Sequence, residues 1–482
     1  MWGAVLGVAG AVTGRADLSE SGERGVHAAS LFSALSIAGL AYALAVGDLT
    51  YRYVASWTSS ITPLPYRLAA VWAGPSGSLL LWALVLGLAT SVASASLPRG
   101  SSLRRWTAAL LALLVVAVLA LTCFDTNPFA RLPFAPDDGR GISLEWMRPI
   151  VLAQMPLGYV ALALVAVPAV ITVMGALGTE AWRDVARRWA LVSWALLCGA
   201  MLLDWRRSYG IGVWIDDWRW APVHAGTAFA WAGATVLIAA TSWRLQVAAT
   251  VTAGFAAFVL ALGGLTMRRA GGWDGVHAFA LSTAGRVVAW VLLVAVIVAI
   301  AAIVRRTGMR AAHGLPARVA FAAQAAVLVV AVALAAAGFP RATDVALSEG
   351  ARATVTDRFG TPWVISLEGV SAVGRGDIVS GLVALRATVN GRARAFVVAE
   401  LRDSYVGSSG RPVEELGVAG IASGLTQDLR VDVREANTTD ALATVRFIPG
   451  ASWIWIGGTC ALLAALFLAG AAVPTGATDA AE

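Results

Sequence analysis

The sequence predicts a polytopic α-helical membrane protein of about 11 transmembrane helices, with a small extracytoplasmic β domain before the last helix. Three observations predict this fold class. Hydrophobic residues make up 58% of the 482 positions and charged residues 13%, and the mean hydropathy is +0.73. Apolar runs of about 18 residues or more recur along the chain, which excludes a soluble globular protein. Between residues 339 and 451 the pattern changes to short alternating strands separated by turns.

The expected spans approach the roughly 20 apolar residues that a bilayer core requires. The first of them, at the amino terminus, is short. In chain order, the spans are expected near residues 1–13, 27–46, 77–96, 106–124, 150–177, 189–204, 222–241, 247–267, 287–304, 319–338 and 453–473.

Arginine density chooses the orientation of these spans. One set of connecting segments holds 13 arginines in 53 residues: 14–26, 97–106, 178–188, 242–246 and 305–318. The alternate set holds 11 in 91 residues: 47–76, 125–149, 205–221 and 268–286. Positively charged loops stay in the cytoplasm, so the denser set is placed there. We therefore expect a multi-pass protein of the bacterial plasma membrane, with its amino terminus outside and its carboxy terminus in the cytoplasm.

Charge and cysteine usage exclude several functions. The net charge of +7 comes from dispersed arginines, and the chain contains no lysine, so no basic run suited to nucleic acid is present. The three cysteines, Cys123, Cys198 and Cys460, lie in or beside apolar spans and form no CxxC pair. Neither a disulfide framework nor a thiol redox centre is expected.

Five parts follow from this organisation: a first transmembrane bundle (1–204), an extracytoplasmic tryptophan-rich segment (205–222), a second bundle with a loop carrying His277 (223–338), the β domain (339–451), and the last helix with a cytoplasmic tail (452–482). The β domain shows alternating strands such as LVALRATV and RAFVVAEL with an Asn-Gly turn between them. Such a domain could bind a partner through a strand edge or a loop, or it could be a passive cap.

The tryptophan-rich segment admits two interpretations. It places Trp205, Trp214, Trp218 and Trp220 within sixteen positions between two long apolar runs. Aromatic rings anchor a segment at the membrane surface because they combine an apolar body with a polar edge. Haem would be covered by the same flat apolar faces, with histidines nearby as axial ligands. Other motifs have to decide between an aromatic belt and a haem shelf.

Several sequence boxes, in order along the chain, carry a family resemblance. The stretch DLTYRYVASWTSSITPLPYRLAAVWAGPSGSLLLW from Asp48 resembles the opening of the CcmF family of cytochrome c-type biogenesis proteins, the haem lyase subunit of the maturation system. The similarity continues with NPFARLPFAPDDGRG from Asn127, WRWAPV in the tryptophan-rich segment, RAGGWDGVHAFA ending at Ala280, DLRV at Asp428 and RFIPGASWIWIGG before the last span.

The resemblance implies a function in cytochrome c maturation, with haem as the cofactor. The expected partners are membrane lipid, apocytochrome c, a CcmE-like haem chaperone and a CcmH-like thiol-reducing protein, and no nucleic acid. A cytochrome c haem lyase would place haem vinyl groups against the two thiols of a CxxCH segment, and its catalysis would come mainly from proximity. The sequence contains no GxSxG, phosphate-binding glycine loop or HExxH motif, so the catalytic residues are unknown.

The family's haem ligands can be carried over one position at a time. His277 matches the histidine of the VHAFA box, whereas Val151 stands where the second extracytoplasmic histidine is expected. Ala239 and Gln324 stand at the two intramembrane ligand positions. Since neither side chain ligates haem iron, the resemblance predicts that the intramembrane b haem is absent.

Two further boxes depart from the family pattern: Ala221 and His224 replace the acidic pair of the tryptophan-rich segment, and Pro75 and Ser76 replace His-Glu in the glycine box. In one account a new axial pair has formed, His277 with either His224 or Met155. In the other, the chain keeps the fold and binds haem weakly or not at all. The alternative function is therefore that of a haem-free scaffold subunit of a cytochrome c assembly complex. A transporter is disfavoured because inverted repeats are not evident.

The expected haem site combines two loops that a hairpin of two helices would bring within about 10 Å. Arginines of these loops could bind the haem propionates, or could simply mark the headgroup boundary. His27 and His313 are expected to be solvated interface residues. The candidate haem-contacting residues are His277 and, more weakly, His224 as iron ligands, with Trp214, Trp218, Trp220, Arg219 and Arg269 around them.

Overall fold

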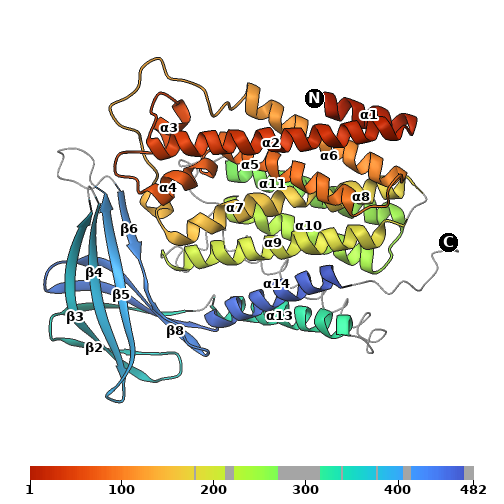
Figure 1. The fold of residues 1–482 in the computed structure, drawn as a ribbon. Coiled ribbons are helices and arrows are strands. Elements are labelled where there is room, and N and C mark those ends of the chain that lie inside the picture. The colour runs from red at the N-terminus through yellow and green to blue at the C-terminus, as the bar shows by residue number, and fades with distance from the viewer. Residues whose placement is uncertain are drawn as a thin grey trace.

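The computed structural model describes residues 1–178, 181–211, 222–269, 315–337, 340–375, 378–404 and 414–471. Figure 1 shows long helices running side by side, with a β-sheet domain at one end of the bundle. Within the described part, six helical segments are long and apolar enough to cross a membrane: Ala16–Val46, Pro75–Ala95, Ser102–Phe124, Pro149–Ala176, Arg183–Tyr209 and Ala451–Gly470. A multi-pass helical protein with a β domain is thereby confirmed; the expected span at 287–304 lies outside the described residues.

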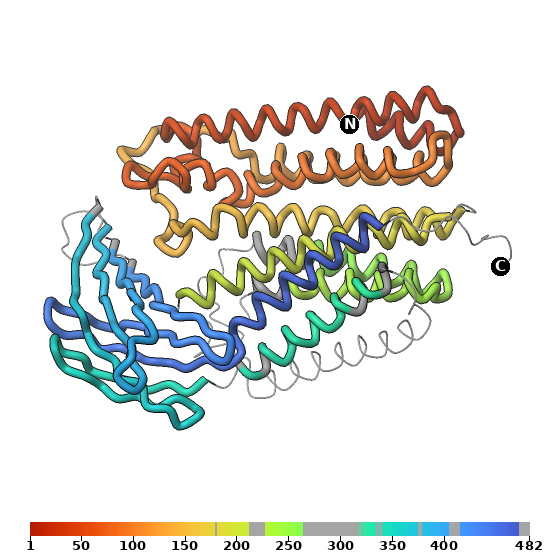
Figure 2. Tube along the Cα trace, turned by 60° about the horizontal axis from the view of Figure 1, so that its bottom comes forward, coloured from red at the N-terminus to blue at the C-terminus, as the bar shows by residue number. Residues whose placement is uncertain are grey.

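The long helices run back and forth between the two ends of the bundle, with α8 continuing α7 as one span (Figure 2). The helices are α1 (Trp2–Thr13), α2 (Ala16–Val46), α3 (Arg52–Trp57), α4 (Leu64–Ala69), α5 (Pro75–Ala95), α6 (Ser102–Phe124), α7 (Pro149–Leu164), α8 (Ala166–Ala176), α9 (Arg183–Tyr209), α10 (Pro222–Ser242), α11 (Val247–Arg269), α13 (Leu315–Ala337) and α14 (Ala451–Gly470), with 3₁₀ turns η1 (Ala70–Trp72) and η2 (Leu144–Trp146).

Glycines allow α1 to lie directly against α2. A Cβ on Gly3 would lie 2.7 Å from the Cα of Gly25, and one on Gly22 would lie 2.6 Å from the Cα of Gly7. Small residues permit this close backbone approach between membrane helices. With 12 residues, α1 is about 18 Å long, less than the roughly 30 Å hydrocarbon core. The expected short first segment is therefore a half-length helix.

Several predicted helix boundaries were wrong, among them the start of α2 and the end of α9. Residues 16–26, expected to be a cytoplasmic loop, form the first turns of α2, because no proline interrupts them and Glu20 lies one turn from Arg24 at 3.9 Å. His27 consequently lies within α2, with an exposed side chain. At the other boundary, α9 continues past residue 204 to Tyr209, where arginines in its last turn complement the helix dipole.

The β domain consists of two antiparallel sheets, in the orders β1-β9-β8-β7 and β2-β3-β4-β5-β6. Side chains alternate along each strand, and the inward ones, such as Leu367, Leu385, Val431 and Phe447, form one core. The strands are β1 (Arg341–Ser348), β2 (Arg352–Thr356), β3 (Pro362–Arg375), β4 (Ile378–Val389), β5 (Arg392–Ser404), β6 (Glu414–Val418), β7 (Gly420–Ala422), β8 (Gln427–Ala436) and β9 (Asp440–Pro449).

A buried network fixes the β domain to the end of α9. The Tyr209 hydroxyl donates to Asp428 of β8 at 2.8 Å, and both side chains are almost fully buried. The amide of Ala419 donates to the carbonyl of Gly210 at 3.0 Å. Ser452 of α14 adds a hydrogen bond of 3.2 Å to Asp428. Because these contacts join α9, β8 and α14, they set the position of the β domain where the tryptophan-rich segment begins.

Candidate functional site

The sequence-predicted site residues lie mostly outside the described part of the chain. This is true of His277, Trp214, Trp218, Trp220 and Arg219, and also of His313. The backbones of His224 and Arg269 are described, at the start of α10 and the end of α11, but their side chains are not. These two helices pack closely as an antiparallel pair, since a Cβ on Gly233 would lie 2.7 Å from the Cα of Ala257. The expected two-helix hairpin is therefore present.

The tryptophan-rich segment follows α9, and the loop with His277 follows α11. The described ends of these helices lie at the end of the bundle that carries the β domain (Figure 1). Arg148 precedes α7 and donates from Nη1 to the carbonyl of Arg207 in α9 at 3.1 Å. Arg402 of β5 donates to the carbonyl of Met147 at 3.4 Å. Gly210 lies against the Arg148 guanidinium, since a Cβ on Gly210 would lie 2.6 Å from Nη2 of Arg148. We call this region, around Arg148, the bundle mouth.

Arg148 sits among other cations. Burial, followed by the charges of Arg402 and Arg206, lowers the pKa of Arg148 below its usual range, while Glu400 and Tyr66 act in the opposite direction. Within the described residues, no carboxylate forms an ion pair with Arg148. Glu400 is instead paired with Arg402 at 2.7 Å. The mouth thus presents an arginine that an anion would stabilise.

A buried polar chain lies directly beneath Arg148. Gln154 of α7 donates to Asp204 of α9 at 3.0 Å, and their exposed fractions are 1% and 2%. Arg207 pairs with the same carboxylate at 3.3 Å and also with Glu145. Buried charges are tolerated when they are paired in this way. Arg207 is therefore occupied within the protein.

One ligand position taken from the resemblance, Val151, and one candidate replacement ligand, Met155, are described at the mouth side of α7. Val151 is 3% exposed, so this position contributes an apolar contact and no iron ligand. Met155 lies one turn further along the same helix face and is half-buried. Inside the bundle, Ala239 in α10 and Gln324 in α13 are both partly buried. The predicted loss of the b haem stays a prediction.

Aromatic rings stack in the segment directly before Arg148. Trp57 of α3 and Trp146 of η2 stack with their centroids 5.8 Å apart and an interplanar angle of 19°. Tyr53 lies against Trp57, and its hydroxyl donates to the Ala70 carbonyl at 2.8 Å while accepting from the Gly74 amide at 2.9 Å. Stacked indoles of this kind present a flat apolar surface.

The glycine box WAGPSG supports these rings. A Cβ on Gly74 would lie 2.5 Å from Nε1 of Trp57, and one on Gly77 would lie 1.7 Å from the carbonyl oxygen of Val71. Pro75 stands at the first position of α5, where its fixed φ favours a helix start. The box is thus a tight turn into α5 that packs against the aromatic lining.

Hydrogen bonds hold the NPFARLPFAPDDGRG loop against the segment that carries Trp57. The amide of Arg52 donates to the carbonyl of Ala130 at 2.8 Å. Asp138 accepts hydrogen bonds from the amide and hydroxyl of Ser60 at 2.8 and 2.7 Å. Burial raises the pKa of Asp138, but these bonds and one from Gly139 outweigh it, and the net pKa is lowered. Two sequence boxes more than seventy residues apart therefore build one structure at the mouth.

Comparison with known proteins finds sequence similarity to cytochrome c-type biogenesis proteins. No family model matches the chain. The cytochrome c-type biogenesis protein CcmF of Pseudomonas aeruginosa is 34% identical over 261 residues, which are 52% of this chain and 39% of that protein. CcmF of Haemophilus influenzae is 33% identical over 264 residues, 52% of this chain and 40% of that protein. CcmF of Escherichia coli is 31% identical over 261 residues, 51% and 40%.

A solved structure described as cytochrome c haem lyase CcmF is similar along almost the whole chain. It superposes with a TM-score of 0.71 and covers 97% of this chain and 95% of its own, at 17% sequence identity. The chain is of the CcmF type. In sequence, the alignment spans about two fifths of the length of the curated CcmF relatives.

The mouth of this CcmF-type chain combines a guanidinium group with aromatic rings. Arg148 could bind a propionate, and the Trp57–Trp146 pair could cover an apolar edge. Within the described residues, no group of three or more His, Cys, Asp or Glu side chains could hold a metal ion. Of the candidate axial ligands, Met155 is described, and the side chains of His277 and His224 are not.

Sequence reasoning missed Trp57, Trp146 and Arg148. All three lie within or beside the boxes that carried the CcmF resemblance, but in sequence Trp57 and Trp146 are almost ninety residues apart, and loop contacts such as those at Arg52 and Ser60 bring them together. Arg148 looked like one of three arginines in an outer loop. The local signal was its position directly before the helix that carries Val151.

Proposed function

We propose that this CcmF-type chain takes part in cytochrome c maturation and holds haem at the bundle mouth for attachment to apocytochrome c. The observation that carries the proposal is Arg148, a partly buried guanidinium without a carboxylate partner among the described residues, beside the stacked Trp57 and Trp146. The whole-chain likeness in fold to a cytochrome c haem lyase supports it.

In this proposal the residues of the mouth position the substrate and exclude water. Arg148 binds a propionate through its planar fork of N–H donors, and the two indoles cover the apolar part of the ring. Haem is the substrate. Each cysteine thiol of the apocytochrome adds across a vinyl group: its sulfur bonds to one vinyl carbon and its proton passes to the other. Holding both reactants in place supplies most of the acceleration.

The orientation and the partners belong to the same proposal. The mouth and the β domain share one end of the bundle (Figure 1), and we place this end outside the plasma membrane and the carboxy terminus in the cytoplasm. A CcmE-like haem chaperone would deliver haem there, and a CcmH-like protein would keep the apocytochrome thiols reduced. His277, with His224 or Met155, would supply the axial ligands.

A haem-free scaffold is the second candidate. It is favoured by Val151, which is buried and apolar at a position where the resemblance implies a ligand, and by Ala239 and Gln324 at the intramembrane positions. A scaffold would keep the β domain as a docking surface and would not need Arg148.

Complementation separates the two candidates. Cells that lack their own CcmF and express this chain should mature cytochrome c, scored by covalent haem on the cytochrome. His277→Ala should lower the yield at least tenfold, and His27→Ala, on an exposed position of α2, should leave it unchanged. If His224 has replaced the lost haem ligand, His224→Ala should lower the yield of mature cytochrome c as much as His277→Ala. Unchanged maturation with His277→Ala, at equal protein levels, would favour the scaffold.

A further inference from the structure

The end of α13 and the start of α14 lie side by side next to the β domain (Figure 1). Gly450, the residue before α14, lies against α13, since its Cβ would lie 3.5 Å from the Cβ of Ala336. The helix α14 is long and apolar enough to cross a membrane, and Trp453 in its first turn is 40% exposed. An exposed tryptophan at the start of a span lies at the level of the lipid headgroups, which accommodate both its apolar body and its N–H group.

Two turns of the β domain lie close to Trp453 and carry exposed apolar side chains. Nε1 of Trp453 donates to the carbonyl of Leu425 in the β7–β8 turn at 2.8 Å, so Leu425 is level with the first turn of the span. The β2–β3 turn is joined to the start of β8, because Gln427 donates to the buried carboxylate of Asp357 at 2.8 Å. Asp357 also accepts from the amide of Phe359 at 2.8 Å, which fixes the tip of that turn. The exposed fractions of Leu425 and Phe359 are 63% and 66%.

Arginines accompany these apolar side chains. Arg358 lies next to Phe359 in the β2–β3 turn, and Arg341 begins β1 shortly after α13; both arginines are exposed. Arg341 donates to the backbone carbonyl of Asp357 at 3.1 Å. Within the described residues, neither arginine pairs with a carboxylate. Guanidinium groups beside exposed apolar side chains match a phospholipid surface, which presents phosphate groups above acyl chains.

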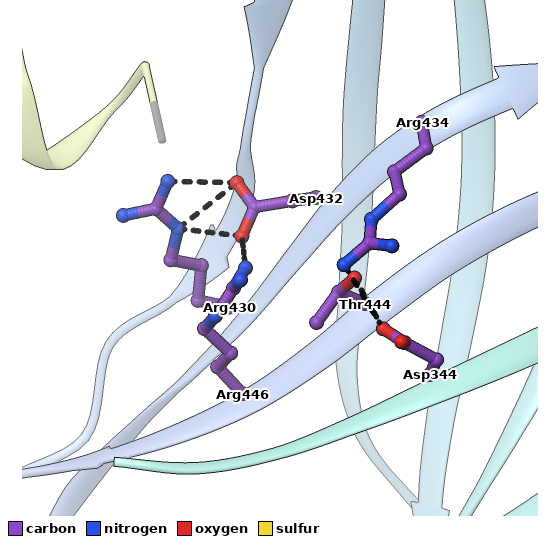
Figure 3. Close-up of polar contacts among 6 residues, drawn as sticks. All are labelled: Asp344, Arg430, Asp432, Arg434, Thr444 and Arg446. Carbon is purple, nitrogen blue, oxygen red and sulfur yellow. Dashed lines mark hydrogen bonds and ion pairs between the residues drawn. The ribbon is translucent and has the colours of Figure 1, made fainter. Parts of the chain in front are cut away.

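The arginines on β8 and β9 differ, because carboxylates of their own sheet accompany them (Figure 3). Asp432 pairs with both Arg430 and Arg446. Arg434, whose side chain is 55% exposed, meets Asp344 at 3.4 Å. An exposed arginine of this domain can thus be paired within the protein, as Arg434 is, and then needs no anion from outside.

We propose that the β2–β3 and β7–β8 turns bind the surface of a phospholipid bilayer. Phe359 and Leu425 insert among the headgroups beside Trp453, because insertion removes their exposed apolar surface from water. Arg358 and Arg341 bind lipid phosphates, which adds attraction to a negatively charged leaflet. The β domain is then held both by its junction with α9 and by lipid. None of these residues belongs to the bundle mouth, so the contact does not depend on haem binding.

Hydroxyl-radical footprinting of the full chain in nanodiscs tests this contact. The discs contain phosphatidylcholine and anionic phosphatidylglycerol and hold one chain each, so that no second copy can cover the turns. Peptide mass spectrometry compares the oxidation of Phe359 with that of Phe396, a phenylalanine of β5. Their exposed fractions in the protein, 66% and 61%, predict similar oxidation rates if water covers both rings. Lipid contact should make Phe359 oxidise about fivefold more slowly than Phe396, or slower still.

Arg358→Gln tests the part played by charge. It should raise the oxidation of Phe359 about threefold in these discs, because the attraction of one arginine to anionic lipid is lost. Arg434→Gln, which removes an arginine paired with Asp344, is the control and should leave Phe359 protected. Equal oxidation of Phe359 and Phe396 in the wild type would overturn the proposal. So would full protection of Phe359 in Arg358→Gln, or a loss of protection in Arg434→Gln as large as that in Arg358→Gln.

Discussion

The junction between the β domain and α9 depends on one buried carboxylate. Asp428 accepts hydrogen bonds from the Tyr209 hydroxyl at 2.8 Å, the Gly424 amide at 3.0 Å and Ser452 at 3.2 Å. Asp428→Ala would leave the first two donors unsatisfied. A buried donor left without a partner costs about 1–3 kcal/mol, so the substitution should destabilise the closed junction by roughly 2–6 kcal/mol.

Hydrogen exchange measures this opening locally. The Ala419 amide reports on it, because it donates to Gly210 across the junction at 3.0 Å. Its protection should fall at least tenfold in Asp428→Ala, and Tyr209→Phe should give a smaller loss of about 1.5–3 kcal/mol. Glu368→Gln, on the other sheet, should leave Ala419 protected as in the wild type. Equal protection in Asp428→Ala and the wild type would refute the role given to this carboxylate.

Three further predictions follow from the same structure. Gly77→Ala should destabilise the chain by at least about 1–3 kcal/mol, because its Cβ would meet the Val71 carbonyl at 1.7 Å, whereas Gly39→Ala, with open space, should be neutral or stabilising in thermal unfolding. Burial raises the pKa of Asp357, but the hydrogen bonds that its carboxylate accepts outweigh burial, and the net pKa is lowered. The contribution of Asp357 to stability should therefore be present above pH about 4 and lost as the pH falls through the folded-state pKa. Asp357→Asn should flatten that part of the curve of unfolding free energy against pH. A reporter fused after Glu482 should be active only if it is of the kind that works in the cytoplasm; activity of the periplasmic kind would contradict the orientation.

Much of the fold could be predicted from the sequence because a bilayer imposes a length and a composition on each span. Apolar runs fixed α5 and α6 to within a few residues. Helix ends beyond the apolar run were not predictable in this way. Residues 16–26 and 205–209 are polar, yet they continue α2 and α9, because helix propensity and charge pairing extend a helix that packing has already formed.

The site was only partly predictable, for a different reason. The residues named from the tryptophan-rich segment follow from a local pattern. Arg148 became distinctive only when folding placed Arg206 and Arg402 beside it, with β5 about 250 residues away in sequence. No periodicity encodes such a juxtaposition. The stacking of Trp57 on Trp146 depends in the same way on loop contacts between distant boxes.

Haem titration of the detergent-purified full chain, followed at the Soret band, tests the central claim most directly. The account predicts saturable binding by the wild type, binding about 10–100-fold weaker in Arg148→Gln through loss of a charge-assisted contact, and wild-type affinity in Arg386→Gln, whose ion pair with Glu368 lies on the β domain. Wild-type protein that binds no haem, or an Arg148→Gln variant that binds it with unchanged affinity, would contradict haem handling at the bundle mouth.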